Sequence, residues 1–492
     1  MDEVKSITTP ASFVGDPPTD ATDELRRKIS ETEAAMAADK EVEEKWVQEI
    51  NERHFYAPVG GVGRIWEVSS NGVLPMRLET FKANYCNVKV QVKKGDTFKF
   101  VEKGAAWIRH PKRRQFLGGV GCYPKAGTCP PDQYNLWQDF AVDPKPGDWS
   151  LFKEHLDQNV CQSDPELTEY LYGWMAHLVQ HPEKPAGVAL VLRGPQAVGK
   201  TIVGEHLGHL FGEGRHFLTI SHQQHITSRF NSHLANIILL LIDEATFPGD
   251  KSAWGHFKSL LTSPMLTIER KGTDIFTMPN FLHVILTSNS DWVVPVESFD
   301  RRWCVIDVGA SRCKDTSFFK AMNEQLISGG YSGLLYDLLR MPLINLLSIP
   351  NTTARIDQKI HTMDPLEKWW LAILQSGELP GSDFEPRFSL WGETERRHLY
   401  GSYKDAVGKY PLDVSLWRKK LTTLSGLEDG PHRRTGIRGR QRTYKFPTLS
   451  ECRARFERVM GVKIEWEKDD DAPHLTVVPA PDKVAAVEGG AV

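Results

Sequence analysis

Long apolar runs are missing from this sequence of 492 residues. The longest, IILLLI from Ile237, is far shorter than the roughly 20 residues that a membrane-spanning helix needs. The N-terminal segment MDEVKSITTP also lacks the basic and then apolar layout of a signal peptide. We therefore expect a cytoplasmic protein without a membrane partner.

Cysteines and net charge are equally scarce. The seven cysteines are scattered, and the closest pair, Cys122 and Cys129, has no second pair beside it at zinc-site spacing. This pattern is typical of incidental thiols in a reducing compartment. The formal net charge of −3 gives the chain as a whole no attraction to nucleic acid. Any such attraction must come from local patches.

What is present predicts several globular domains, since apolar residues make up 40% and charged residues 25% of the chain. Changes in texture divide the sequence into a polar leader, partly helical or disordered, over 1–54; a small mixed or β-rich region over 55–146; a helical segment over 147–185; a P-loop core over 186–308; a helical extension over 309–363; a C-terminal domain over 364–480; and a disordered tail over 481–492.

The core of the chain contains three apolar runs, GVALVLRG, IILLLIDEA and FLHVILTSN, in which strict alternation is absent. Strands that are buried on both faces have this composition. The runs therefore predict an α/β fold with a parallel sheet flanked by helices.

A phosphate-binding loop follows the first run. The stretch GPQAVGKT fits the pattern G-x-x-x-x-G-K-[ST] at every position, between an apolar strand and a helical pattern. Lys200 is placed to charge-pair with ATP phosphates, and Thr201 to offer a hydroxyl to Mg²⁺. The predicted ATP contacts are Gly194, Pro195, Gln196, Ala197, Val198, Gly199, Lys200 and Thr201.

Polar residues end the other two runs. Asp243 and Glu244 follow the second strand, at the edge where open α/β sheets bind ligands. We expect Asp243 to hold Mg²⁺ and Glu244 to polarise the attacking water. Asn289 follows the third run, where a polar side chain can hold that water or sense the γ-phosphate.

Two further segments carry basic residues whose roles the residues alone leave open. Arg301 and Arg302 precede another apolar strand; they are either ordinary surface arginines or fingers that complete a neighbouring subunit's site. The stretch MLTIERKGTDIFTMPNF predicts a β-hairpin with Arg270 and Lys271 near its tip. That hairpin is either simply solvated or able to grip a nucleic-acid backbone.

The order of these motifs resembles the superfamily 3 helicases of the AAA+ class. Most similar are the phage and plasmid replicative primase-helicases, including the helicase half of phage primase-polymerases, and the resemblance extends from about Gly104 to Val308. It implies a hexameric ring that hydrolyses ATP and moves along single-stranded DNA, 3′ to 5′, during replication. For a phage protein this would take place in the cytoplasm of a bacterial host.

The resemblance also implies roles for single residues. Lys200 matches the Walker A lysine, Asp243 and Glu244 match Walker B, Asn289 matches sensor 1, and Lys271 matches the pore-hairpin lysine. Arg301 or Arg302 would be the finger, and the doublet permits either.

The resemblance to primase-polymerases does not extend to their primase activity. Residues before the helical segment show no D-x-D or D-x-E pair on a convincing strand. We therefore expect a helicase that works with a separate primase or polymerase.

The C-terminal domain resembles a winged helix. Two predicted helices, the second opening near Asp413, precede the basic stretch PHRRTGIRGRQRTYKF. The stretch is either a wing that contacts DNA phosphates or a flexible basic loop without a ligand. The predicted DNA contacts, with the pore hairpin included, are Arg270, Lys271, Arg433, Arg434, Arg438, Arg440 and Arg442.

Two other functions stay open at this stage. An AAA+ remodelling or loading ATPase would bind DNA without processive unwinding. A P-loop small-molecule kinase would transfer phosphate to an acceptor and would not need Glu244.

Overall fold

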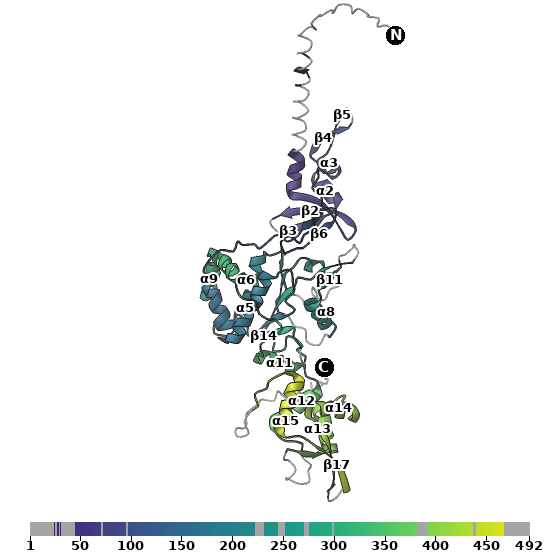
Figure 1. The fold of residues 1–492 in the computed structure, drawn as a ribbon, viewed down its shortest axis with the longest axis vertical. Helices are drawn as coiled ribbons and strands as arrows, with labels where there is room; N and C mark the ends of the chain where they lie inside the picture. Colours follow the sequence, from purple (N-terminus) through teal and green to yellow (C-terminus); the bar gives the residue numbers. More distant parts are fainter. Residues whose placement is uncertain are drawn as a thin grey trace, which may run out of the picture.

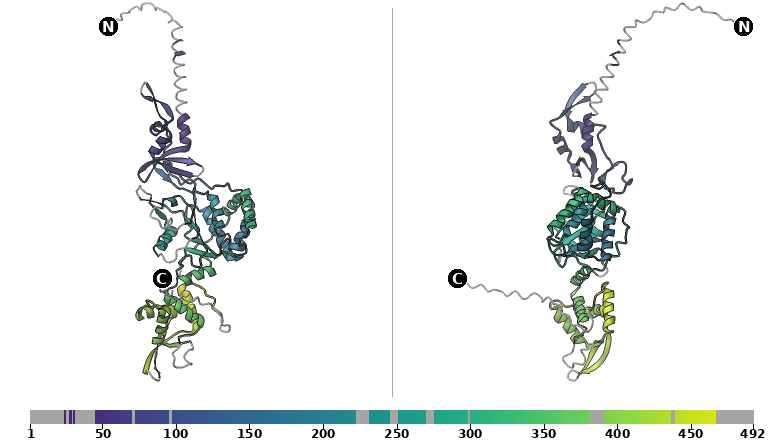
Figure 2. Two further views of the ribbon diagram at one scale, coloured as in Figure 1. Left: turned by 180° about the vertical axis from the view of Figure 1, so that it is seen from behind. Right: turned by 90° about the vertical axis from the view of Figure 1, so that its left-hand side faces the viewer.

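The computed structural model describes residues 24, 27, 28, 30, 45–69, 72–94, 97–221, 231–244, 251–269, 275–297, 300–380, 391–435 and 439–466. At 93, 94, 251–253, 433–435, 439 and 440 it describes the backbone alone. Three units follow one another along the long axis, as Figure 1 and the two further views in Figure 2 show. We call them the N-terminal unit (45–146), the central unit (147–363) and the C-terminal unit (364–466).

The N-terminal unit mixes short strands and helices. Its elements are β1 (His54–Val59), β2 (Val62–Ser69), β3 (Gly72–Met76), α2 (Leu78–Asn84), β4 (Lys89–Lys94), β5 (Thr97–Glu102), α3 (Lys103–Arg109), β6 (Gly119–Gly121) and β7 (Gln133–Asn135). Residues 45–53 are also helical, and Trp46, Val47 and Ile50 pack into one core with Phe81 and Trp107. This unit therefore starts earlier than position 55, because the polar leader ends in an apolar stripe.

A five-stranded parallel sheet organises the central unit, in the order β14-β8-β13-β10-β9. Its strands are β8 (Ala189–Arg193), β9 (Phe217–Ile220), β10 (Leu239–Ile242), β13 (His283–Ser288) and β14 (Trp303–Asp307). The predicted parallel sheet is thus confirmed. The short edge strand β9 was not predicted, since four residues are too few to show a period.

Both faces of this sheet are buried, which explains why its strands are apolar without alternation. Leu190 and Leu192 of β8 pack into a core on one face, whereas Ala189 and Val191 pack into a second core on the other. Helices cover both faces (Figure 1). The sheet is therefore a rigid platform whose strand ends carry the polar residues.

The remaining elements of the central unit are helices and one hairpin. The helices are α4 (Ser150–Glu154), the π-helix η1 (His155–Val160), α5 (Pro165–Gln180), α6 (Lys200–Phe211), the short 3₁₀ turn η2 (Ser232–Leu234), α8 (Lys251–Thr262), α9 (Thr316–Gln325), η3 (Leu326–Gly330), α10 (Tyr331–Leu338) and α11 (Thr353–Thr362). Strands β11 (Met265–Ile268) and β12 (Phe276–Pro279) pair antiparallel, as the alternation predicted.

The C-terminal unit has its own core around Trp370, Trp417 and Phe456. Its elements are α12 (Pro365–Ser376), β15 (Glu393–Glu395), α13 (Arg396–Val407), α14 (Val414–Ser425), β16 (Glu428–Thr435), β17 (Gly439–Lys445) and α15 (Leu449–Met460). Asp413 caps α14, which confirms the predicted helix start. The strand-like HLTVV stretch and the tail over 481–492 lie outside the described residues.

Candidate nucleotide site and basic groove

The phosphate loop (Gly194–Gly199) connects the end of β8 to the start of α6. Gly194 and Gly199 have φ of 151° and 88°, a region that glycine enters without strain. A Cβ at position 199 would lie only 2.6 Å from Cε1 of His155. The spacing of the motif therefore reflects both backbone conformation and the close approach of a neighbouring helix.

Lys200, the first residue of α6, is buried among oxygen atoms of the site. Its Nζ donates to the carbonyl oxygen of Gly194 at 2.8 Å, to that of Pro195, and to Oδ1 of Asn289 at 2.7 Å. Asn289 follows β13, which lies beside β8 in the sheet. The fold thus brings together two predicted site residues that are 89 positions apart.

Asp243 follows β10 and accepts two hydroxyl hydrogen bonds on a single carboxylate oxygen. Oγ1 of Thr201 donates to its Oδ1 at 3.0 Å, and Oγ1 of Thr287 donates to the same atom. Thr287 is a site residue that the sequence reasoning missed. It stands two positions before Asn289, and this spacing on a strand indicated a shared side.

The surroundings of Lys200 act on its pKa in opposite directions. Burial lowers the pKa of Lys200, while the nearby Asp243 and Glu244 carboxylates act to raise it. Glu244 is exposed and has a φ of 53°, an uncommon conformation for a residue other than glycine. Such backbone strain clusters at functional sites.

Thr201 and Asp243 offer the ligand types that Mg²⁺ prefers, a hydroxyl and a carboxylate oxygen. These two oxygens already converge at hydrogen-bond distance. The residues present therefore fit a magnesium ion held together with nucleotide phosphates.

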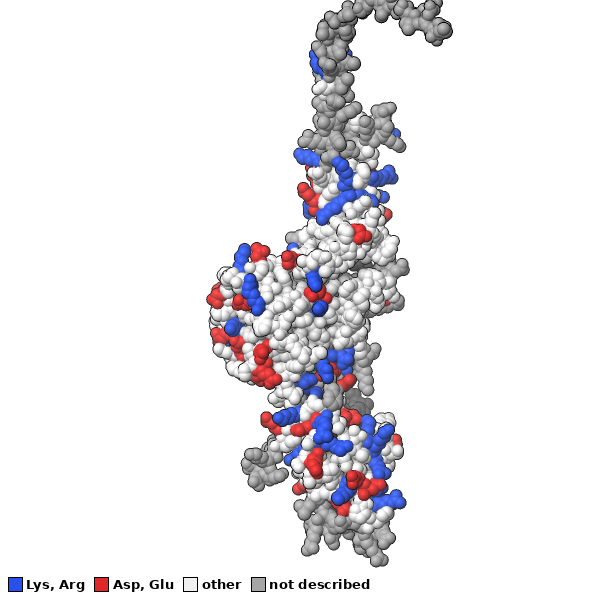
Figure 3. Space-filling model, viewed as in Figure 1, with Lys and Arg blue, Asp and Glu red and all other residues white. Residues whose placement is uncertain are grey.

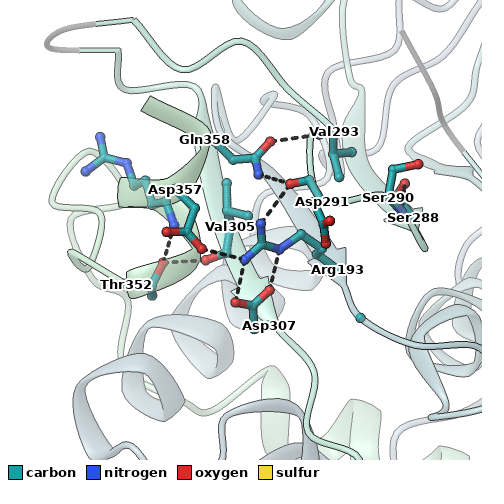
Figure 4. A network of polar contacts seen from close by, with 12 residues as sticks. Arg193, Ser288, Ser290, Asp291, Val293, Val305, Asp307, Thr352, Asp357 and Gln358 are labelled. Atoms are coloured by element: carbon teal, nitrogen blue, oxygen red, sulfur yellow. Dashed lines mark hydrogen bonds and ion pairs between the residues drawn. The ribbon is translucent and has the colours of Figure 1, made fainter. Parts of the chain in front are cut away.

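Arg193, the last residue of β8, holds the base of the phosphate loop in place (Figure 4). Its Nε and Nη2 donate to the two carboxylate oxygens of Asp307 at 2.5 and 2.7 Å, and Nη2 also donates to Asp357 at 3.0 Å. Nη1 donates to the carbonyl oxygen of Asp291 at 2.7 Å. These hydrogen bonds, the one with Asp307 foremost, raise the pKa of Arg193. One guanidinium thus joins β8, β14, α11 and the loop that carries Asn289.

Arg301 and Arg302 lie at the amino ends of the parallel strands, whereas the phosphate loop lies at their carboxyl ends. The backbone N–H of Ala189, the first residue of β8, donates to the carbonyl oxygen of Arg302 at 2.8 Å. The loop follows the other end of that strand, about 15 Å away at about 3.3 Å per residue. The structure therefore does not bring the arginine pair to this chain's own nucleotide site.

The tip of the hairpin, with Arg270 and Lys271, lies outside the described residues. Asn231 anchors β11 close to this turn, since its Nδ2 donates to the carbonyl oxygen of Thr267 at 2.8 Å. Oδ1 of Asn231 accepts from the backbone N–H of Glu269 at 2.9 Å. Both bonds reach the end of β11 that leads into the turn, so Asn231 fixes this strand to the segment that precedes β10.

A groove of about 1080 Å³ crosses the C-terminal unit between α13, α14 and β17. Its lining includes five basic residues: Arg396, Arg397, Arg418, Lys419 and Arg442. In Figure 3 basic and acidic side chains are interspersed over this unit. Among the described residues the groove therefore gathers positive charge from three elements.

Asp429 joins two of the groove arginines. Its Oδ1 accepts from Nη2 of Arg396 at 2.6 Å and from Nη2 of Arg418 at 2.7 Å. The Arg396 guanidinium also lies 4.6 Å from the centre of the Tyr444 ring. A carboxylate and an aromatic ring thus hold the two cations in place.

The predicted basic wing is placed only in part. Arg433 and Arg434 lie on β16 and Arg440 on β17, where the backbone alone is described, and Arg438 lies outside the described residues. Arg442 is exposed and lines the groove. The sequence reasoning missed the α13 and α14 arginines, although the runs ERRH and WRKK marked both helices as basic.

No helix among the described residues combines the length and the apolar character that crossing a bilayer requires.

Comparison with known proteins places these features in context. The model of a family of unknown function, DUF5906, matches residues 192–302, from the end of β8 to the arginine pair. By sequence, 152 residues, or 30% of this chain, are 28% identical to the DNA primase-polymerase of Nitratiruptor phage NrS-1. That match spans 21% of the length of the phage protein.

By structure, the chain is similar to apo structures of the C-terminal region of NrS-1. One superposes with a TM-score of 0.57 at 16% identity and covers 80% of this chain and 96% of the other. An A-form structure superposes with a TM-score of 0.54, also at 16% identity, over 73% of this chain and 94% of the other. At this identity the likeness shows a shared mixed α/β fold with a parallel sheet.

Proposed function

We propose that this chain is an ATP-dependent DNA helicase of a phage or mobile genetic element and moves along single-stranded DNA during replication. The observation that carries the proposal is the convergence of Lys200, Asn289, Thr201 and Asp243 at the carboxyl edge of one parallel sheet. The sequence match to a phage DNA primase-polymerase supports a role in phage DNA replication.

In the proposed hydrolysis, each residue has a separate task. The N–H groups of the phosphate loop and Nζ of Lys200 bind the β- and γ-phosphates. Glu244 accepts a proton from water as its oxygen attacks the γ-phosphorus, and the bond to the bridging oxygen of ADP breaks. Asn289 orients the water or the γ-phosphate. Mg²⁺, held by Thr201 and Asp243, would neutralise charge that develops on the phosphate oxygens.

The arginine pair completes the site in this proposal, but from a neighbouring copy. Arg301 and Arg302 lie at the amino ends of the strands, away from the phosphate loop of the same chain. Of the two, Arg301 is the more exposed, while Arg302 lies 3.4 Å from Oδ1 of Asp300. This location supports a ring, which we propose to be a hexamer, in which each site draws on two subunits.

Two elements are proposed to contact DNA. The hairpin with Arg270 and Lys271 would grip the strand in the pore of the ring, and the anchoring of β11 by Asn231 supports a defined position. The groove of the C-terminal unit would contact phosphates through its arginines. The order of two helices and a two-stranded hairpin in that unit supports a winged-helix-like module.

ATP turnover by the purified chain, measured with and without single-stranded DNA, tests the proposal. We expect hydrolysis that single-stranded DNA stimulates. Turnover that is indifferent to DNA but depends on a small acceptor would indicate a kinase instead. DNA-stimulated hydrolysis without strand displacement would indicate a loading or remodelling ATPase.

A further inference from the structure

Each carbonyl group of the phosphate loop accepts a hydrogen bond, and the last four accept from donors outside the loop and α6. Nζ of Lys200 donates to the carbonyl oxygens of Gly194 and Pro195. The next four carbonyls accept from two segments far away in the sequence. Gln196 accepts from Sγ of Cys313 at 3.7 Å, Ala197 from the N–H of Lys314 at 3.0 Å, Val198 from Nδ2 of Asn159 at 2.9 Å, and Gly199 from Nε2 of His155 at 3.1 Å.

This arrangement has a geometric consequence for nucleotide binding. In a tight loop, consecutive carbonyl groups that point to one side leave the N–H groups free to point to the other. A loop whose carbonyls are fixed by external donors therefore presents its N–H groups to a phosphate without reorganising first. Preorganisation of this kind increases affinity because less conformational freedom is lost on binding.

Two of the four external donors come from η1, a π-helical turn that continues α4. His155 and Asn159 are both fully buried and are four positions apart, so they share the face of η1 that meets the loop. Because a carbonyl oxygen only accepts, His155 must carry its proton on Nε2. Isolated π-helical turns are rare and are frequent at functional sites.

Asn159 also connects η1 to the other segment that donates to the loop, the one after β14. Its Oδ1 accepts from Oγ of Ser311 at 2.8 Å, and its backbone carbonyl accepts from the N–H of Gly309 at 2.7 Å. The segment after β14, which carries Cys313 and Lys314, is thereby attached to η1. One buried amide thus fixes the positions of both segments.

We infer that Asn159 and His155 are positioning residues that hold the phosphate loop in its nucleotide-binding conformation. They act through the carbonyls of Val198 and Gly199 and do not touch the nucleotide. The inference rests on the proposed function, because it assumes that the loop binds ATP.

The test is the affinity of the full chain for MgADP, measured by calorimetry together with the thermal unfolding midpoint without nucleotide. Asn159→Asp keeps the acceptor for Ser311 but removes the donor to Val198. Loss of one buried hydrogen bond corresponds to about tenfold in an equilibrium constant, so we expect MgADP to bind about tenfold more weakly. Tyr172→Phe is the matched control, since it removes the 2.7 Å bond to Asp157 of the same helix without touching the loop.

A second pair of variants covers the case in which Asn159→Asp does not fold. His155→Gln retains a side-chain N–H of similar reach and should keep most of the affinity, whereas His155→Phe should lose about tenfold. A folded Asn159→Asp variant with wild-type affinity, or equal affinities for the two His155 variants, would overturn the inference. A wild-type chain that does not bind MgADP would overturn the proposed function as well.

Discussion

The carboxyl ends of the central strands, where we propose that ATP binds, and the basic groove of the C-terminal unit both carry basic side chains, but in opposite surroundings. At the sheet edge, Lys200 is 7% exposed and each of its proton donors has an oxygen partner. In the groove, the Arg418 side chain is 44% exposed and its partner Asp429 is 53% exposed.

This difference in burial determines how much a single basic residue can contribute to the binding of a phosphate. A buried charge acts in a low-dielectric environment, where its interaction with a phosphate is strong. Exposed charges are screened by water and salt, so each contributes little and binding depends on their number. We therefore expect all-or-none effects at the sheet edge and graded effects in the groove.

The largest effect should follow removal of the buried charge. Lys200→Ala should lower ATP turnover about 1000-fold, because no other described cation reaches the same atoms. Steady-state phosphate release measures this. The control is Lys320→Ala, whose side chain is 77% exposed. Near-wild-type turnover in Lys200→Ala would contradict the assignment of the phosphate loop.

Removal of the arginine pair should have the next largest effect, at the boundary between subunits of the proposed ring. Arg301→Ala combined with Arg302→Ala should lower turnover about 100-fold or more, with nucleotide affinity little changed. Mixing this variant with Lys200→Ala should restore activity, since some boundaries then combine an intact loop with intact arginines. A mixture no more active than its components would contradict a shared site.

Substitutions in the groove should weaken DNA binding in small steps. Arg396→Ala combined with Arg418→Ala should weaken single-stranded DNA binding about tenfold, and the slope of affinity against salt should fall by about 1.4. Fluorescence anisotropy over a range of salt concentrations measures both. Arg458→Ala, at an exposed position of α15 outside the groove lining, is the control and should change affinity less than twofold. An unchanged salt slope in the double variant would exclude the groove as a phosphate contact.

The last prediction concerns the free energy of unfolding rather than activity, and it involves Lys359, which joins the central unit to the C-terminal unit. Its Nζ donates from α11 to the carbonyl oxygen of Gly461, the C-cap of α15, at 2.5 Å. Burial, reinforced by Arg355, lowers the pKa of Lys359 to about 8. Between this value and about 10.5 the unfolded chain holds a proton that the folded chain has lost, so the free energy of unfolding rises with pH.

Lys359→Met should remove that rise. Urea unfolding at about pH 7.5 and about pH 10 should show the wild type gaining stability relative to Lys359→Met at the higher pH. A parallel change in both proteins would mean that Lys359 titrates as an ordinary exposed lysine.

The same contrast explains what the sequence could predict. Lys200, Thr201, Asp243 and Asn289 each stand at the end of an apolar strand or in a motif of fixed spacing. Because parallel strands end at one edge, local patterns were enough to bring these residues together. The structure confirms that they converge, while their roles in hydrolysis stay predictions.

Other parts of the site depend on contacts between distant segments. Asn159 and Arg193 act through partners 39 and 114 positions away. Hydrophobic periodicity describes a single element and cannot predict partners so far away in the sequence. The one local signal was that His155 and Asn159 are polar residues on the apolar face of a helix. The groove combines two helices and a strand, so its arginines could be recognised as basic but not as one surface.

Strand displacement on a forked DNA is the measurement that tests the central claim most directly. With MgATP, the wild-type chain should release the labelled strand from a fork of one tail polarity, and Lys200→Ala should release none. DNA-stimulated ATP hydrolysis without displacement from forks of either polarity would contradict a helicase and favour a loading ATPase.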